Sequence, residues 1–196
     1  MKIKGILLAA GASKRFGRQK LLEILPSGVP ILIASWRSLY EANADSVVVT
    51  REDDIPVQAL LQSESIPFIK CSDSGTGMSK TLLHGVKYSR DYDGWIISLG
   101  DMPFIKSATT NKIMHAMRTK GDKKMIFRPR FKQRFGNPEG LSAKLLPKLL
   151  DLKGDEGARS ILSEYQTETF VLDVLDEGIL KDIDRPSDLT KFTKQQ

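Results

Sequence analysis

Short apolar segments alternate with helical patterns along most of the chain, and this alternation limits the folds that the sequence can adopt. The apolar segments are short enough for strands and lie at residues 3–10, 45–51, 66–70, 94–100 and 123–129. Helical patterns separate them, at about 31–44, 54–63, 75–90 and 106–118. Strands that alternate with helices in this way form βαβ units. We therefore expect a mostly parallel sheet with helices on both faces.

The last third of the chain has a different pattern. We predict a loop-rich stretch at 131–140, helices at 141–154 and 155–165, a strand at 168–175, and a short helix after Pro186. No repeat, low-complexity segment or linker interrupts the sequence, and 196 residues suit one domain with a sizeable core. We therefore expect a single domain over residues 1–196.

Composition and charge narrow the class of partner. The net charge is +6, but the basic residues are scattered except in the loop after the first strand and at 128–134, which favours a polyphosphate ligand over nucleic acid. No apolar run approaches the roughly 20 residues that span a bilayer, so we expect no membrane partner. One cysteine and two histidines argue against a disulfide framework or a zinc site. We expect a cytoplasmic protein.

The loop after the first strand combines small residues with positive charge. It reads "ILLAAGASKRFGRQK" and carries Lys14, Arg15, Arg18 and Lys20 with no acid among them. Neither common glycine-rich phosphate motif is present, yet backbone amides after a buried strand can still point at an anion. Arg15 and Lys20 could reach that anion, whereas Lys14 and Arg18 would point outward. The alternative is a solvated basic surface.

Two aspartates follow apolar segments, and each lies two residues before a proline. Asp101 comes after "WIISLG", and Asp184 ends "GILKDID". If both segments end at the same edge of the sheet, the carboxylates face the basic loop. Mg²⁺ commonly binds one or two carboxylates together with substrate phosphates and water, so this pair is a candidate metal site. Asp182 is an alternative ligand, and a helix cap or turn cap is the structural alternative for Asp101 and Asp184.

Five stretches together resemble a known family. "LLAAGASKRFGRQKLL", "LGDMP" and "DIDRPSDL" resemble the motifs of nucleotidyltransferases with the glycosyltransferase-A-like Rossmann fold. "GTGMSKTL", and the long stretch that begins at "FGNPEG" and contains "GDEGARS", are similar to molybdenum cofactor cytidylyltransferases, which are MobA-like, and to related xanthine dehydrogenase accessory proteins. The resemblance covers residues 5 to 190. It implies a three-layer Rossmann-like α/β fold.

The resemblance also implies a reaction and a set of site residues. CTP and molybdopterin would give molybdopterin cytosine dinucleotide and pyrophosphate with Mg²⁺, and Arg15, Lys20 and Asp101 would be catalytic. Asp101 and Asp184 would bind the metal. The acceptor would contact Gly136, Asn137 and Pro138, with Arg134 nearby. The nucleotide would be bound by Leu8, Ala9, Ala10, Gly11, Ser13, Arg15, Lys20, Gly77, Met78, Ser79 and Asp101.

Several alternatives remain beside this expectation. Ala10 stands where guanylyltransferases of the family have glycine, which favours CTP over GTP, but a molybdopterin guanylyltransferase or a sugar-1-phosphate nucleotidyltransferase would share the loop and the aspartates. A non-catalytic molybdopterin chaperone is the alternative of another class. A molybdoenzyme of the xanthine dehydrogenase type is the recipient that the resemblance implies. Glu139 and Gly140 replace apolar residues of the family, Ser79 could instead cap a helix, and Arg159 could pair with Asp155 or Glu156.

Overall fold

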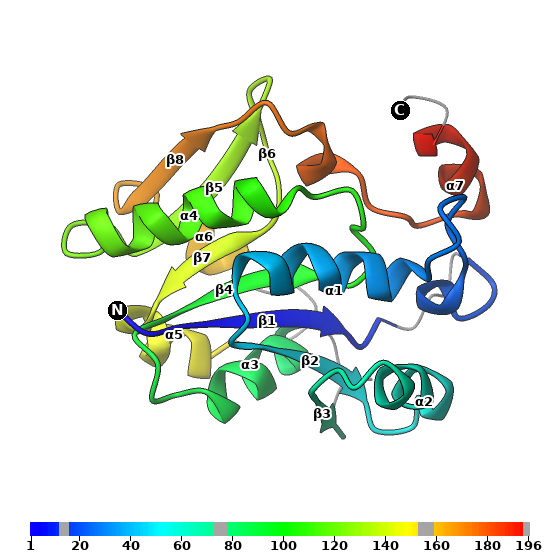
Figure 1. Cartoon of the computed structure of the whole chain (residues 1–196). Coiled ribbons are helices and arrows are strands. Elements are labelled where there is room, and N and C mark those ends of the chain that lie inside the picture. The colour runs from blue at the N-terminus through cyan, green and yellow to red at the C-terminus, as the bar shows by residue number, and fades with distance from the viewer. Residues whose placement is uncertain (12–15, 73–77, 153–158, 194–196) are drawn as a thin grey trace.

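The computed structural model arranges the chain in three layers, with a mixed sheet between two sets of helices (Figure 1). It describes residues 1–11, 16–72, 78–152 and 159–193. The strands are β1 (Ile3–Ala9), β2 (Ser46–Arg51), β3 (Phe68–Cys71), β4 (Gly94–Leu99), β5 (Ile126–Phe131), β6 (Arg134–Phe135), β7 (Glu139–Ser142) and β8 (Thr169–Asp173). Their order is β3-β2-β1-β4-β7-β5-β6, and β8 pairs with β5.

Helices connect the strands and cover the sheet. They are α1 (Ile31–Ala42), α2 (Ile55–Ser63), α3 (Met78–Tyr88), α4 (Ser107–Lys120), α5 (Leu146–Leu150), α6 (Arg159–Glu164) and α7 (Pro186–Thr193). The described residues also contain the short 3₁₀ helices η1 (Lys20–Leu22), η3 (Ala143–Leu145) and η4 (Glu177–Leu180). In the described part of the chain, every helix is too short or too polar to cross a membrane.

The first half of the sheet is parallel, as the sequence predicts. β1 pairs in parallel with β2 on one side and with β4 on the other, and β2 pairs in parallel with β3. Leu7 on one face of β1 and Ile6 on the other are both fully buried. All four strands therefore end at the same edge of the sheet, which we call the carboxyl edge, and α7 lies beside this edge (Figure 1).

Two apolar cores lie on the two faces of the sheet. One contains side chains of α1, α2 and α4, and the other contains side chains of α3, α5 and α6. Trp95 of β4 is fully buried in the second core, where its indole N–H donates to the backbone oxygen and the hydroxyl of Ser89. Burial on both faces explains why the inner strands β1 and β4 contain continuous apolar runs, such as those at 6–9 and 95–97, rather than alternating patterns.

The predicted loop at 131–140 is wrong in part, because it contains strands. β6 forms a hairpin with β5, and β7 is inserted antiparallel between β4 and β5. α4 packs so closely over β7 that a Cβ on Gly140 would lie 2.8 Å from the sulfur of Met117 and 3.0 Å from Ile113. A strand that needs glycine at its centre lacks the β-branched residues by which strands are predicted.

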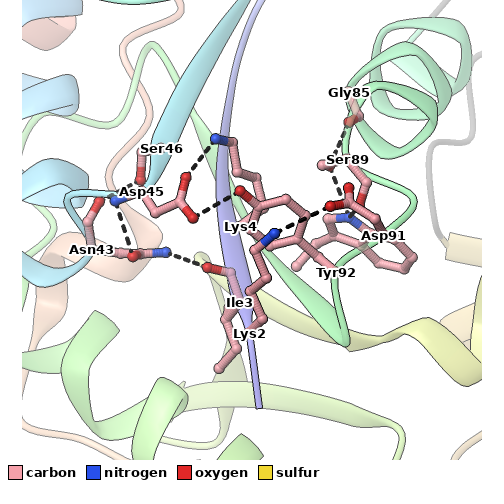
Figure 2. Close-up of polar contacts among 11 residues, drawn as sticks. Lys2, Ile3, Lys4, Asn43, Asp45, Ser46, Gly85, Ser89, Asp91 and Tyr92 are labelled. Atoms are coloured by element: carbon pink, nitrogen blue, oxygen red, sulfur yellow. Dashed lines mark hydrogen bonds and ion pairs between the residues drawn. The ribbon is translucent and has the colours of Figure 1, made fainter.

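The opposite end of β1 carries a cluster of paired charges (Figure 2). Lys4 Nζ lies 2.6 Å from Asp45 Oδ1, and the Tyr92 hydroxyl donates to Asp45 Oδ2 at 2.8 Å. Lys2 Nζ lies 3.1 Å from Asp91 Oδ2 and 4.1 Å from the centre of the Tyr92 ring. Each lysine here has its own carboxylate and shares the tyrosine, so this edge is electrically balanced.

Candidate active site

Three charged side chains from distant parts of the chain meet at the carboxyl edge. Lys20 Nζ donates to Asp101 Oδ2 at 2.7 Å and to Asp184 Oδ1 at 3.0 Å, across 81 and 164 residues of sequence. The ammonium is nearly buried, with 9% of the Lys20 side chain exposed, against 22% and 29% for the two aspartates. One oxygen of each carboxylate is therefore directed at the same buried point.

Lys20 is positioned by the short helix η1. The side-chain oxygen of Gln19 accepts from Leu21 N at 3.3 Å, and its amide nitrogen donates to Asp54 Oδ2 at 2.5 Å. Asp54 in turn caps the start of α2 through Val57 N. Leu21 is buried in the first core. These contacts fix the backbone of η1 and bring the Lys20 side chain to the edge of the sheet.

Asp101 follows β4 in a turn that is fixed from two sides. Gly100 N donates to Leu8 O of β1 at 2.9 Å, and the Ser35 hydroxyl of α1 donates to Gly100 O at 2.9 Å. A Cβ on Gly100 would lie 3.2 Å from Leu8 O, so a side chain at this position would crowd the turn. The sequence placed Asp101 correctly, directly beyond a buried strand.

Asp184 reaches the site by a different route from the one predicted. The segment before it is not a strand that ends at the sheet edge, because η4 is followed by irregular chain from 181 to 185. Ile183 N donates to Asp101 O at 2.9 Å, and the Ile183 side chain is fully buried. The carboxylate of Asp188 accepts from Asp184 N and from Arg185 N. Asp188 therefore stabilises the start of α7 and the backbone that carries Asp184.

The electrostatics of the cluster favour a charged lysine. Burial lowers the pKa of Lys20, but the charges and hydrogen bonds of Asp101 and Asp184 together outweigh burial and raise this pKa above its ordinary value. Asp182 is exposed as a residue, yet desolvation of its carboxyl group, with the negative charges of Asp184 and Asp101, raises its pKa. One ammonium between two carboxylates gives the cluster a formal charge of −1.

Among the other cations of the opening loop, Arg18 is paired with an acidic residue. Arg18 forms a two-bond pair with Glu23, at 2.5 Å from Nε to Oε1 and 2.6 Å from the second nitrogen to Oε2. Its side chain is 66% exposed, which agrees with the prediction that Arg18 points outward. Although the quoted stretch contains no acid, Arg18 and Lys20 are paired with acids that lie outside it. Lys14 and Arg15 lie outside the described residues.

The other predicted nucleotide contacts are distributed between the core and the carboxyl edge. Leu8, Ala9 and Ala10 are buried at the end of β1, and Gly11 is exposed. Met78 begins α3 and is half exposed, and Ser79 is buried in the first turn, so Ser79 does not cap this helix. Ser13 and Gly77 lie outside the described residues, as do the proposed partners of Arg159, Asp155 and Glu156.

The predicted acceptor segment packs against η4. The Asn137–Pro138 peptide bond is cis, and Asn137 N donates to Ile179 O at 3.1 Å. A Cβ on Gly136 would overlap the same carbonyl oxygen. Gly136 therefore has a packing role, since only glycine allows the chain to approach η4, and η4 leads directly to the segment that carries Asp184.

Sequence reasoning missed Asp176, a buried carboxylate that joins the segments of the two site aspartates. Its Oδ2 accepts from Lys106 N at 2.9 Å and from the Thr109 hydroxyl at 2.7 Å, and its Oδ1 accepts from Gly178 N at 3.0 Å. It therefore ties the start of α4, which follows the Asp101 loop, to η4. In the sequence it is one acid in a polar turn, which gives no signal of this role.

Replacing Gly178 by alanine should destabilise the protein. A Cβ on Gly178 would overlap the carbonyl oxygen of Phe104, so η4 would have to move away from the loop that follows Asp101. We expect a loss of about 1–3 kcal/mol in the free energy of unfolding, the usual cost of overpacking a close contact. Denaturant unfolding measures it. Gly11→Ala is the matched control, because no atom of the described residues lies within 4 Å of a Cβ built there, and an equal loss in both variants would contradict the prediction.

The two carboxylates suit a hard divalent cation. Their oxygens converge on one point, and Mg²⁺ sites of this kind use one or two carboxylates and complete the octahedron with phosphate oxygens and water. Among the described residues, no group of three or more His, Cys, Asp and Glu side chains is placed to hold a metal ion. The two carboxylates therefore fit an ion whose remaining ligands are phosphate oxygens of a substrate and water.

One protein-family model and two curated proteins each match most of this chain. Residues 5–169 match the model of the MobA-like NTP transferase domain. The purine catabolism protein PucB of Bacillus subtilis (strain 168) is 30% identical over 195 residues, covering 94% of this chain and 92% of that protein. Nicotine blue oxidoreductase of Paenarthrobacter nicotinovorans is 26% identical over 189 residues, covering 93% and 92%.

Solved structures share the fold along the whole chain. A nucleotidyl transferase from Methanothermobacter thermautotroptrophicus superposes with a TM-score of 0.82 at 21% identity, covering 99% of this chain and 97% of that one. Rv0371c of Mycobacterium tuberculosis H37Rv, in complex with manganese, gives 0.75 at 20% identity and covers 100% of both chains. A 4-diphosphocytidyl-2C-methyl-D-erythritol synthase from Anaerococcus prevotii DSM 20548 gives 0.76 at 15% identity, covering 100% and 96%.

Proposed function

Because the chain belongs to the MobA-like NTP transferase family, we propose that this nucleotidyltransferase transfers CMP from CTP to the phosphate of molybdopterin. An oxygen of the acceptor phosphate attacks the α-phosphorus of CTP, the bond to the β-phosphate breaks, and pyrophosphate leaves. The acceptor oxygen is already ionised, so no general base is required. The observation that carries the proposal is the convergence of Lys20, Asp101 and Asp184 at the carboxyl edge, beside the opening loop.

Each residue of the cluster has a role in this reaction. Lys20 neutralises charge on the α-phosphate and on the attacking phosphate, and the carboxylates of Asp101 and Asp184 bind Mg²⁺. The ion, when bound, supplies positive charge to the phosphate oxygens of the transition state. Backbone amides from Ala10 to Ser13, with Arg15, bind the triphosphate. Catalysis is then mainly alignment and electrostatic stabilisation.

The other parts of the site bind the two substrates. Gly77, Met78 and Ser79 contact the base or the ribose at the start of α3, and the acceptor lies against the segment from Gly136 to Pro138. Residues 1–196 act as one domain, and the reaction takes place in the cytoplasm, where CTP is available. The name of the Bacillus relative, a purine catabolism protein, supports a recipient molybdoenzyme of the xanthine dehydrogenase type, since xanthine is a purine.

CTP should be preferred over GTP by the natural protein. Ala10 stands where guanylyltransferases of the family have glycine, and one structural neighbour is named for a diphosphocytidyl product. Ala10→Gly should narrow the preference without inverting it, because base selection depends on several contacts. Initial rates with both nucleotides measure the ratio. Ala116→Gly, a similarly buried alanine in α4, controls for lost stability, and equal rates of the natural protein with CTP and GTP would contradict the assignment.

A nucleotide screen with purified molybdopterin tests the proposed function. The protein is incubated with Mg²⁺, molybdopterin and each of the four nucleoside triphosphates, and pyrophosphate and dinucleotide are quantified. We expect molybdopterin cytosine dinucleotide as the main product. Tight molybdopterin binding without any product would support a chaperone instead. Product formation only with sugar 1-phosphates would support the sugar nucleotidyltransferase alternative.

A further inference from the structure

The ammonium of Lys20 occupies the position between Asp101 and Asp184 at which both carboxylates point. It lies 2.7 Å from one carboxylate oxygen and 3.0 Å from the other. Mg²⁺ binds carboxylate oxygens at about 2.0–2.1 Å, so an ion that contacted these two oxygens would compete with the Lys20 ammonium for the same lone pairs. The lysine contact and joint coordination of a divalent ion by these oxygens therefore compete.

We propose that Lys20 is the internal cation of the nucleotide-free site, and that a divalent ion binds to Asp101 and Asp184 only after the triphosphate has drawn the ammonium away. This inference rests on the proposed function, since the phosphates of the nucleotide supply the competing negative charge. It explains why a lysine expected to bind phosphate is paired with two acids.

The side chain is suited to such an exchange. A lysine ammonium is a compact charge on a flexible four-carbon stem, so it can move while the backbone of η1 stays in place. That backbone is fixed through Gln19 and the buried Leu21. The exchange also avoids a state in which two convergent carboxylates repel each other without a cation. The metal is then bound with the nucleotide or after it, and not before it.

Binding of Mn²⁺ to the nucleotide-free protein tests the proposal without reference to catalysis. Free Mn²⁺ is followed by electron paramagnetic resonance as each variant is titrated. Lys20→Met should bind Mn²⁺ at least tenfold more tightly than the natural protein, because the cluster changes from a formal charge of −1 to −2 and loses its internal competitor. Adding Asp101→Asn to Lys20→Met should abolish the gain, which would locate the ion at the carboxylate pair.

Lys4→Met is the matched control. Lys4 is also a largely buried lysine, with 12% of its side chain exposed, and it pairs with Asp45 at 2.6 Å, but it lies at the opposite end of β1 (Figure 2). The substitution removes the same charge and a similar ion pair. We expect Mn²⁺ affinity within about twofold of the natural protein, since charges this far apart are screened by salt.

Thermal unfolding shows whether Lys20→Met folds, and Lys20→Gln replaces it if it does not. Unchanged or weaker Mn²⁺ binding in the folded variant would overturn the proposal. Unfolding of both variants even in the presence of Mn²⁺ would overturn it as well, since an ion bound to the two carboxylates should then replace the missing ammonium. Tighter Mn²⁺ binding by Lys20→Met beside a natural protein that transfers no nucleotide would reject the proposed function alone. Nucleotide transfer by the natural protein, without tighter Mn²⁺ binding by Lys20→Met, would reject this inference alone.

Discussion

Asp101→Ala should lower Mg²⁺-dependent nucleotidyl transfer on the order of 10²-fold or more, because bound metal supplies several kcal/mol to the transition state. The fold should remain intact. The backbone contacts that fix the Asp101 turn, from Gly100 N to Leu8 O and from Ile183 N to Asp101 O, do not involve the side chain. The carboxylate is also partly exposed, so its removal leaves no closed cavity.

Steady-state turnover at saturating Mg²⁺ is the measurement, with circular dichroism as the test of folding. Asp45→Ala is the matched control, because Asp45 also forms an ion pair with a largely buried lysine, Lys4, at the opposite edge of the sheet. The control should keep its turnover within about twofold, because Asp45 is 47% exposed and lies at the edge of the sheet opposite the candidate site. Full activity of Asp101→Ala at saturating Mg²⁺ would reject the assignment of this residue to the metal.

Lys20→Ala should have an effect of similar size. Removing one positively charged group that faces the developing charge of a transition state typically costs about 10²–10³-fold in rate. Because the pKa of Lys20 is raised, its ammonium stays charged at neutral pH and throughout the pH range in which an ordinary lysine loses its proton. The charge is lost only as the pH rises through the raised pKa. A plot of turnover against pH should therefore show no change caused by Lys20 near neutral pH.

The other cations of the loop separate a phosphate-binding site from a solvated surface. Arg15→Ala should be as damaging as Lys20→Ala, whereas Lys14→Ala and Arg18→Ala should mainly slow nucleotide association, and less so at high salt. The effect of Arg18 should be small, since Glu23 already neutralises it. Turnover and nucleotide affinity at two salt concentrations measure these differences. Four equal and small effects would contradict the role of the loop.

The two readouts of Lys20 variants are expected to move in opposite directions. Turnover falls because the phosphates lose a cation, while Mn²⁺ binding to the nucleotide-free protein rises because the carboxylates lose their internal partner. A lysine with a purely structural role would lower both. Measuring both on the same Lys20→Met preparation therefore distinguishes a substrate contact from a stabilising ion pair.

Local sequence patterns were sufficient for much of the parallel half of the sheet and for the position of Asp101 just beyond β4. The β1, β2 and β4 segments are continuous apolar runs because both faces are covered, so their burial is visible residue by residue. Asp101 was found for the same reason: a buried strand must end at the sheet edge, and Gly100 and Pro103 mark that end. The basic residues of the opening loop were found by position, but not their acid partners.

The remaining features depend on contacts between segments far apart in sequence. β7 is a strand because α4 covers Gly140 and because β4 and β5 lie on either side of it, and none of this is encoded in its four residues. Asp184 lies beside Lys20 because the backbone N–H of Ile183 donates a hydrogen bond to Asp101 O. In addition, the Asp176 carboxylate connects η4 to the start of α4 through hydrogen bonds. Periodicity reports which residues are buried, but the pairing of two buried segments is set by the closure of the whole chain. The sequence alone therefore determined the strands of the parallel half and named Lys20, Asp101 and Asp184 as candidates, and the tertiary structure decided that these three side chains meet.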